Sequence, residues 1–86
     1  MKLHEMFDAL VWELRADRLD AAAARVGATV EPAVRLSGSE TWIGPAADDA
    51  RFALGTATRA TREAAVALRR AAAMCRSKAE AARAAP

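Results

Sequence analysis

The positions of glycine and proline divide this chain into two long stretches that favour helix. Neither residue occurs before Gly27, and the central segment 38–45 contains two glycines and a proline. No alternating run of four or more β-branched residues is present, so strands are not indicated. The pattern predicts an all-α, antiparallel two-helix hairpin, with helices over about 3–36 and 45–83 and a turn over about 37–44.

The second helix has clear start signals. Gly44 suits the N-cap and Pro45 suits the first helical position, where its missing N–H is no loss. Asp48 and Asp49 follow in the first turn, where the helix dipole favours negative charge.

The first helix contains two residues that oppose helix. Gly27 costs about 1 kcal/mol relative to alanine in a helix interior, and Pro32 costs about 3 kcal/mol if it is truly interior. We therefore expect a kink or a frayed segment near these residues.

The size of the chain indicates that it needs a partner. Its 86 residues form a single domain, 1–86, and a chain of this length buries only about 60–65% of its unfolded surface. Cys75 is the only cysteine and His4 the only histidine, so an internal disulfide and a four-ligand zinc site are both excluded. We expect no metal and no cofactor. A partner chain is the remaining supplement to a small core.

Apolar residues on the second helix recur in steps of three and four, the spacing of a coiled-coil seam. The predicted seam is Ala50, Leu54, Ala57, Thr61, Ala64, Leu68, Ala71 and Cys75. Alanines flank it on both sides: Ala53, Ala60 and Ala67, with Met74, on one, and Ala65, Ala72 and Ala79 on the other. Arginines recur every seven residues along the edge and mark solvent: Arg62, Arg69, Arg76 and Arg83. So wide an apolar face favours packing against more than one neighbour.

The first helix carries two apolar stripes. The first steps by three and four through Ala9, Trp12, Ala16, Leu19, Ala23, Val26, Val30 and Ala33. The second lies largely on another side and comprises Leu3, Met6, Phe7, Leu10 and Leu14. One hairpin can cover only one stripe, and a large exposed apolar patch usually marks an interface. We expect these five residues, with Leu54 and Leu68, to contact a partner in a four-helix bundle.

Trp42 lies in the predicted turn, within "SETWIGPAAD". We expect its ring to fold over the tips of both helices and close the hairpin, because a large aromatic gains most from burial. Trp42-Ile43-Gly44, placed mid-chain between two helices of similar length, resembles the WXG motif of the small type VII (ESX, ESAT-like) secretion proteins. Trp42 and Gly44 are the residues onto which that motif carries over.

The resemblance implies a function. Members are helical hairpins that pair as four-helix bundles and leave the cell through an ATPase-driven machine, as effectors or as targeting partners of larger toxins. It implies a partner that is another WXG-like hairpin, the N-terminal helical domain of a toxin, or a second copy. Many export pairs also carry Y-x-x-x-D/E on a C-terminal tail, and this chain has no tyrosine. We therefore expect the chain to need a partner for export.

The N-terminal stretch carries Glu5, Asp8 and Glu13 and has no small-residue cleavage site, so a secretory signal peptide is not indicated. Apolar runs are far shorter than the roughly 18 residues of a membrane span. These features, with the resemblance, predict a protein that is cytoplasmic before export and then secreted or placed at the cell surface without a signal peptide.

The charge of the chain is divided unevenly between its two halves. Residues 51–86 hold eight basic and two acidic side chains, a net charge of +6, whereas residues 1–50 have a net charge of −4. A basic helix could follow nucleic-acid phosphates, so a nucleic-acid-associated protein is the alternative. We favour a solvated face partly neutralised by the acidic first helix, because no aromatics interleave with the arginines.

An enzyme is not indicated. The chain has no glycine-rich phosphate loop, and neither His4 nor Cys75 has a positioned third group. Asp48 and Asp49 point about 100° apart on a helix, so they do not form a carboxylate pair. We predict that the chain is not an enzyme and takes no small-molecule substrate, that Cys75 is a buried core thiol, and that His4 is exposed.

Overall fold

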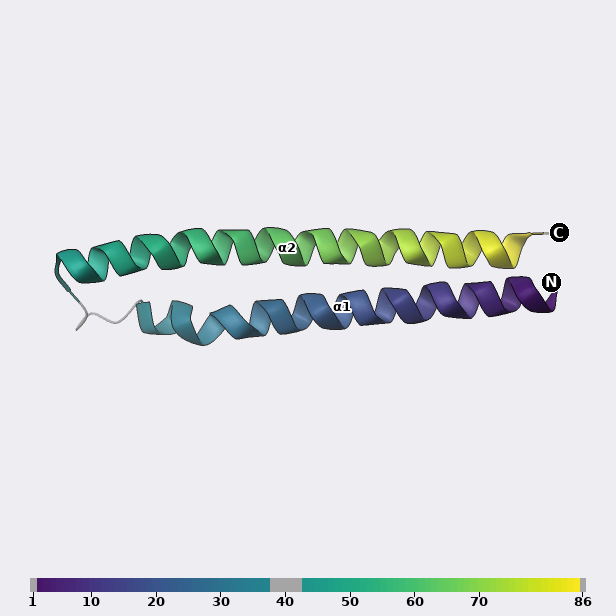
Figure 1. Cartoon of the computed structure of the whole chain (residues 1–86), viewed down its shortest axis with the longest axis horizontal. Coiled ribbons are helices and arrows are strands. Elements are labelled where there is room, and N and C mark those ends of the chain that lie inside the picture. The colour runs from purple at the N-terminus through teal and green to yellow at the C-terminus, as the bar shows by residue number, and fades with distance from the viewer. Residues whose placement is uncertain (1, 38–42, 86) are drawn as a thin grey trace.

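Two long α-helices, α1 (Leu3–Ser37) and α2 (Pro45–Ala84), lie side by side in the computed structural model, which describes residues 2–37 and 43–85. Figure 1 shows them running antiparallel, with both chain termini at the same end. The molecule measures 65 × 15 × 12 Å, so its described part is a rod that consists of the two helices alone, with no further layer packed on them. The described residues form two helices and no strand, as predicted, and the helix limits lie within one residue of the expected ranges.

Both helices begin with a backbone hydrogen bond across their first turn, and α1 also has a side-chain cap. The Lys2 N–H donates to Glu5 Oε2 at 3.1 Å, which is half of a capping box, and the Met6 N–H donates to the Lys2 carbonyl at 3.1 Å. At α2, the Asp48 N–H donates to the Gly44 carbonyl at 3.0 Å, directly before Pro45. Gly44 is therefore the N-cap and Pro45 the first helical residue, as the sequence indicates.

α1 continues through Gly27 and Pro32 to Ser37, so neither residue ends the helix. Pro32 has no N–H to donate to the Ala28 carbonyl. Ala28 and Pro32 are both exposed, so water can donate the missing hydrogen bond to that carbonyl. The Thr29 hydroxyl, in the same turn, donates to the Arg25 carbonyl at 2.8 Å.

The core consists almost entirely of small side chains. The buried apolar residues are Ala9, Ala16, Ala23, Ala47, Ala65, Ala72, Cys75 and Ala79, and Trp12 and Leu19 pack beside the cluster of Ala16, Ala72 and Cys75. Alanine at these positions allows two helices to approach closely, but it removes little apolar surface from water. The hairpin is therefore well packed along a narrow line and open on both sides of it.

The first stripe of α1 is the one that faces α2: Ala9, Ala16 and Ala23 are buried, and Trp12, Leu19, Val26 and Val30 are half-buried. The side chain of Ala33 lies outside the described part. On α2 the predicted seam is correct at six of its eight residues. The residues that are buried or half-buried are Ala50, Leu54, Thr61, Leu68, Ala71 and Cys75. Ala57 and Ala64 are instead exposed, whereas Thr58 and the predicted flank residues Ala65, Ala72 and Ala79 are buried. The centre of the α2 seam therefore lies closer to that flank than predicted.

Candidate functional site

The second stripe of α1 is an exposed apolar surface, which we call the outer stripe: Leu3, Met6, Phe7, Leu10 and Leu14. Their exposed fractions are 81%, 47%, 66%, 57% and 50%. At 100° per residue, Leu3, Phe7, Leu10 and Leu14 lie on the side of α1 opposite Ala9 and Ala16. The outer stripe thus points away from α2, and α2 does not cover it.

The spacing of the outer stripe is that of a second helix–helix seam. Leu3, Phe7, Leu10 and Leu14 follow one another at steps of four, three and four, which keeps them on one line along a supercoiled helix. A partner helix laid along this line would meet four large side chains in succession. The shape and chemistry of this surface therefore suit another apolar helix better than a small molecule.

The predicted interface residues on α2 occupy a different place. Leu54 and Leu68 are half-buried and alternate with Thr58, Ala65 and Ala72, which are buried. That spacing places both leucines on the α2 row that faces α1. The structure therefore brings Leu54 and Leu68 to the contact between the two helices and not to the outer stripe.

The turn motif is described only in part. Gly44 is exposed, and its backbone has φ 109° and ψ 172°, a region that is essentially restricted to glycine. A Cβ added at Gly44 would meet nothing within 4 Å, so the constraint comes from the backbone alone. Trp42, which we expected to close the hairpin, lies outside the described residues. Ile43, between them, is 80% exposed.

Ion pairs join the two helices along one edge near the termini. Arg76 Nη2 donates to Asp20 Oδ2 at 2.6 Å and to Asp17 Oδ1 at 3.3 Å, and Arg83 donates to Glu13. The hydrogen bond to Asp20 is the main reason that the pKa of Arg76 is raised above its ordinary value. The acidic first helix thus neutralises part of the basic second helix, as the charge distribution predicts.

The other edge near the termini is organised around Trp12. The Arg15 guanidinium lies 4.8 Å from the centroid of the Trp12 ring, and the Lys78 ammonium lies 5.1 Å from it. Lys78 comes from α2, so one of these cation–π contacts crosses between the helices. Cys75 is a buried free thiol and His4 is exposed, both as predicted.

In the part of the chain that the structure describes, no group of three or more His, Cys, Asp or Glu side chains could hold a metal ion. Among the same residues, no helix is long and apolar enough to cross a membrane.

Comparison with protein-family models, with curated proteins and with solved structures finds no match for this chain. The resemblance to the WXG proteins therefore rests on the turn motif and the helix layout alone. Sequence reasoning missed one feature: of the four arginines at seven-residue intervals on α2, only Arg76 and Arg83 meet an acidic partner among the described residues. The signal lies in the pairing register between the helices, which a single sequence does not supply.

Proposed function

We propose that this chain is a non-enzymatic pairing module, in which the outer stripe binds a helix of another protein. The exposed outer stripe is the observation that carries this proposal. Leu3, Phe7 and Leu10 each leave more than half of their surface in water. Removing such side chains from water stabilises a complex by about 25 cal/mol per Å² of apolar area buried.

The total surface of the hairpin supports the same conclusion. It exposes 6360 Å², whereas a folded monomer of 9.1 kDa is expected to expose about 4,900 Å². The excess is close to 1,500 Å², and a standard interface buries about 800 Å² on each partner. A standard interface would thus cover about half of this excess, so the hairpin has enough extra surface for at least one such interface.

Within this function, we propose a role in type VII secretion, as a substrate or a targeting partner. The support is the Trp42-Ile43-Gly44 motif between two antiparallel helices, with Gly44 in a conformation that requires glycine. The partner would be another WXG-like hairpin, the N-terminal helical domain of a toxin, or a second copy completing a four-helix bundle. Because the chain has no tyrosine for a tail motif, export would depend on the partner.

The test of pairing compares two Phe→Glu variants in sedimentation. Phe7 lies in the outer stripe, whereas Phe52 is equally apolar and 79% exposed but lies on α2, away from the stripe. We expect the wild-type chain to be a dimer, to bind a helical partner, or to be poorly soluble. Phe7→Glu should abolish association and Phe52→Glu should not. A wild-type chain that is a stable, fully helical monomer at micromolar concentration would contradict the proposal.

The test of secretion is expression in a secretion-competent host with the neighbouring genes deleted. We expect no protein in the medium until a partner that carries the tail motif is restored. Efficient secretion of the chain alone, blocked by loss of the type VII ATPase, would show that a partner is not needed.

A further inference from the structure

Four arginines at seven-residue intervals, Arg62, Arg69, Arg76 and Arg83, form a row along one edge of α2, which we call the arginine row. Because the helices are antiparallel, each step of seven residues down α2 matches a step of seven up α1. Arg83 meets Glu13 and Arg76 meets Asp20. The same register places Gly27 opposite Arg69 and Val34 opposite Arg62. The matching row on α1 is therefore Glu13, Asp20, Gly27 and Val34. It consists of two acidic residues, a glycine without a side chain and an apolar residue.

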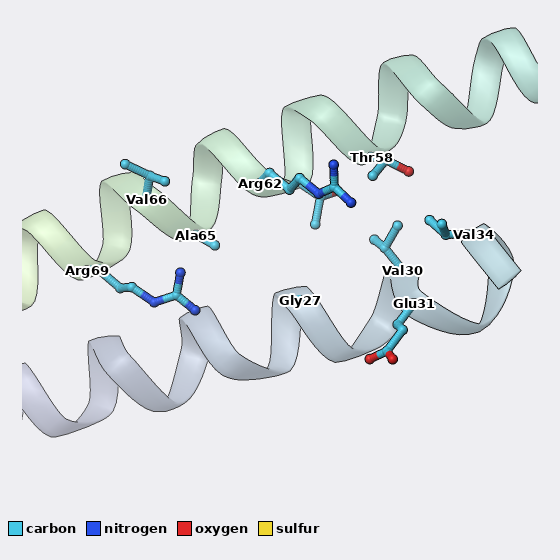
Figure 2. Close-up of a pocket in the computed structure, with 10 residues that line it drawn as sticks. Gly27, Val30, Glu31, Val34, Thr58, Arg62, Ala65, Val66 and Arg69 are labelled. Carbon is cyan, nitrogen blue, oxygen red and sulfur yellow. The ribbon is translucent and has the colours of Figure 1, made fainter.

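The two arginines without an acid border a groove between the helices. A hollow of about 530 Å³ is lined by Gly27, Val34, Arg62 and Arg69, among others. In Figure 2, Arg69 reaches from α2 toward α1, and Val30 and Val34 rise from α1 toward α2. Gly27 lines the groove without a side chain, and a Cβ built on it would meet nothing within 4 Å, so the groove is open at this position.

The floor of the groove holds an unpaired polar atom. Thr58 is only 8% exposed, and its hydroxyl has no hydrogen-bond partner among the described residues. The Thr61 hydroxyl, one turn further along, instead donates to the Ala57 carbonyl at 2.8 Å. Thr58 also lines a second hollow of about 300 Å³ that shares Val34 and Arg62 with the first. A buried hydroxyl without a partner is uncommon and points to a group that the hairpin does not itself supply.

Glu31, the carboxylate among the described residues that line the groove, does not neutralise the arginines. Glu31 Oε1 accepts a hydrogen bond from Arg35 Nη2 at 2.9 Å, one turn along α1. In Figure 2 the Glu31 carboxylate points away from α2. No ion pair joins Arg62 or Arg69 to a carboxylate in the described parts of α1 and α2. The groove therefore combines a floor of apolar side chains and the buried Thr58 hydroxyl with two positive charges on its rim.

We propose that this groove binds an acidic amphipathic helix of a partner protein. The helix carries two carboxylates seven residues apart, which meet Arg62 and Arg69, and apolar side chains between them, which fill the space over Gly27. Seven residues span about 10.5 Å along a helix, so two carboxylates seven residues apart on the partner helix match the spacing of the two arginines. The partner thus supplies what α1 supplies to Arg76 and Arg83. This surface differs from the outer stripe, so the proposal does not depend on pairing through that stripe.

A second copy of the chain does not fit this groove. Glu13 and Asp20 are the only acidic residues in the sequence that are seven positions apart. Both already pair with Arg83 and Arg76 of their own chain. Offering them to another copy would break two ion pairs to form two, with no net gain. The complementary charges must come from a different protein.

The experiment uses the full chain and a synthetic, side-chain-stapled helical peptide of about 15 residues, a length at which an unstapled helix is marginal. The peptide carries two glutamates seven positions apart with leucines between them, and its control carries glutamines. Binding is followed by fluorescence anisotropy. We expect the glutamine peptide to bind at least tenfold more weakly, because charge-assisted hydrogen bonds are lost. Equal binding of the two peptides would overturn the proposal.

The matched protein variants remove two charges each. Arg62→Gln/Arg69→Gln should weaken binding of the glutamate peptide about 100-fold, or about tenfold for each arginine. The control is Arg18→Gln/Arg25→Gln, which removes two exposed arginines that are also seven apart but lie on α1. It should change binding less than threefold, as should Phe7→Glu, which tests the outer stripe separately. Similar losses in the two double variants would show that the attraction is only general charge.

A second series tests the position of the groove without removing any arginine. Gly27→Glu places a carboxylate opposite Arg69 in the same chain, so it should reduce peptide binding at least tenfold. It should also melt higher than Gly27→Gln in low salt, with the difference lost in high salt. Gly27→Ala leaves most of the groove open and should bind within threefold of wild type. Equal peptide binding by Gly27→Glu and Gly27→Ala would overturn the proposal. Self-association of the wild-type chain that Arg62→Gln/Arg69→Gln abolishes would overturn the assignment to a different protein.

Discussion

The two halves of this hairpin share one register but differ in how completely the helices satisfy each other. Near the termini, Trp12 packs beside Ala16, Ala72 and Cys75, and ion pairs close one edge. Near the turn, the same edge opens into a groove with an unpaired hydroxyl, that of Thr58. In the terminal half, the two helices satisfy each other as in a two-helix coiled coil. In the turn half, the packing resembles that of a coiled coil from which one helix has been removed.

This difference shows that register and side-chain content are separate requirements. The arginine row of α2 is uniform along its length, so α2 offers the same positive charges for ion pairs in both halves. The change lies in α1, where Glu13 and Asp20 give way to Gly27 and Val34. Regularly spaced arginines on one helix therefore do not predict ion pairs unless the residues opposite them on the other helix are acidic.

The largest expected effect is the loss of Trp12. Trp12→Ala removes the one large ring that packs on the central cluster and two cation–π contacts, so it should lower the free energy of unfolding by about 3 kcal/mol. Val30→Ala, in the turn half, should cost only about 1 kcal/mol, because Val30 borders a groove that is already open. Urea denaturation measures both. Equal losses would mean that the halves are equally well packed.

Gly44→Ala should have the next largest effect. At φ 109° and ψ 172° an alanine is strained, and the cost should be about 2 kcal/mol although the new methyl group meets no atom. Gly55→Ala is the control, because Gly55 lies inside α2 and open space surrounds its Cβ position. That change should instead raise the free energy of unfolding by about 0.5–1 kcal/mol. A stabilising Gly44→Ala would show that the turn can be rebuilt around another backbone conformation.

The sequence predicts the helices well because their signals are local. The sparse glycines and prolines, the cap at Gly44 and Pro45 and the first stripe of α1 all lie within short windows of the chain. Trp12 and Leu19 belong to that first stripe, which is the one that packs against α2. Leu3, Phe7 and Leu10 stand out in the same way as an apolar set that one neighbouring helix cannot cover.

The α2 seam could not be predicted as well, because alanine surrounds most of the helix. Ala57 and Ala64 are exposed whereas Thr58 and Ala65 are buried, and the two pairs differ by a rotation of about 100°. Nothing in an alanine-rich face selects one choice over the other until α1 is laid against it. Which arginines lack an acidic partner could not be predicted either, because that also depends on how α1 is aligned against α2. The expected role of Trp42 as a plug stays a prediction, since that residue lies outside the described part of the chain.

The smallest expected effect separates two threonines one turn apart on α2. The Thr58 hydroxyl is buried without a partner, whereas the Thr61 hydroxyl donates to the Ala57 carbonyl at 2.8 Å. Replacing threonine with valine keeps the shape and the β-branching, and removes only the hydroxyl. Thr58→Val should therefore raise the free energy of unfolding by about 1 kcal/mol, because a desolvated polar group is removed. Thr61→Val should change it by less than about 0.5 kcal/mol, because an exposed hydrogen bond is lost. Both are measured by urea denaturation of the isolated chain. If Thr58→Val instead destabilises the chain, water already satisfies this hydroxyl, and the turn half is more complete by itself than its contacts with α1 indicate.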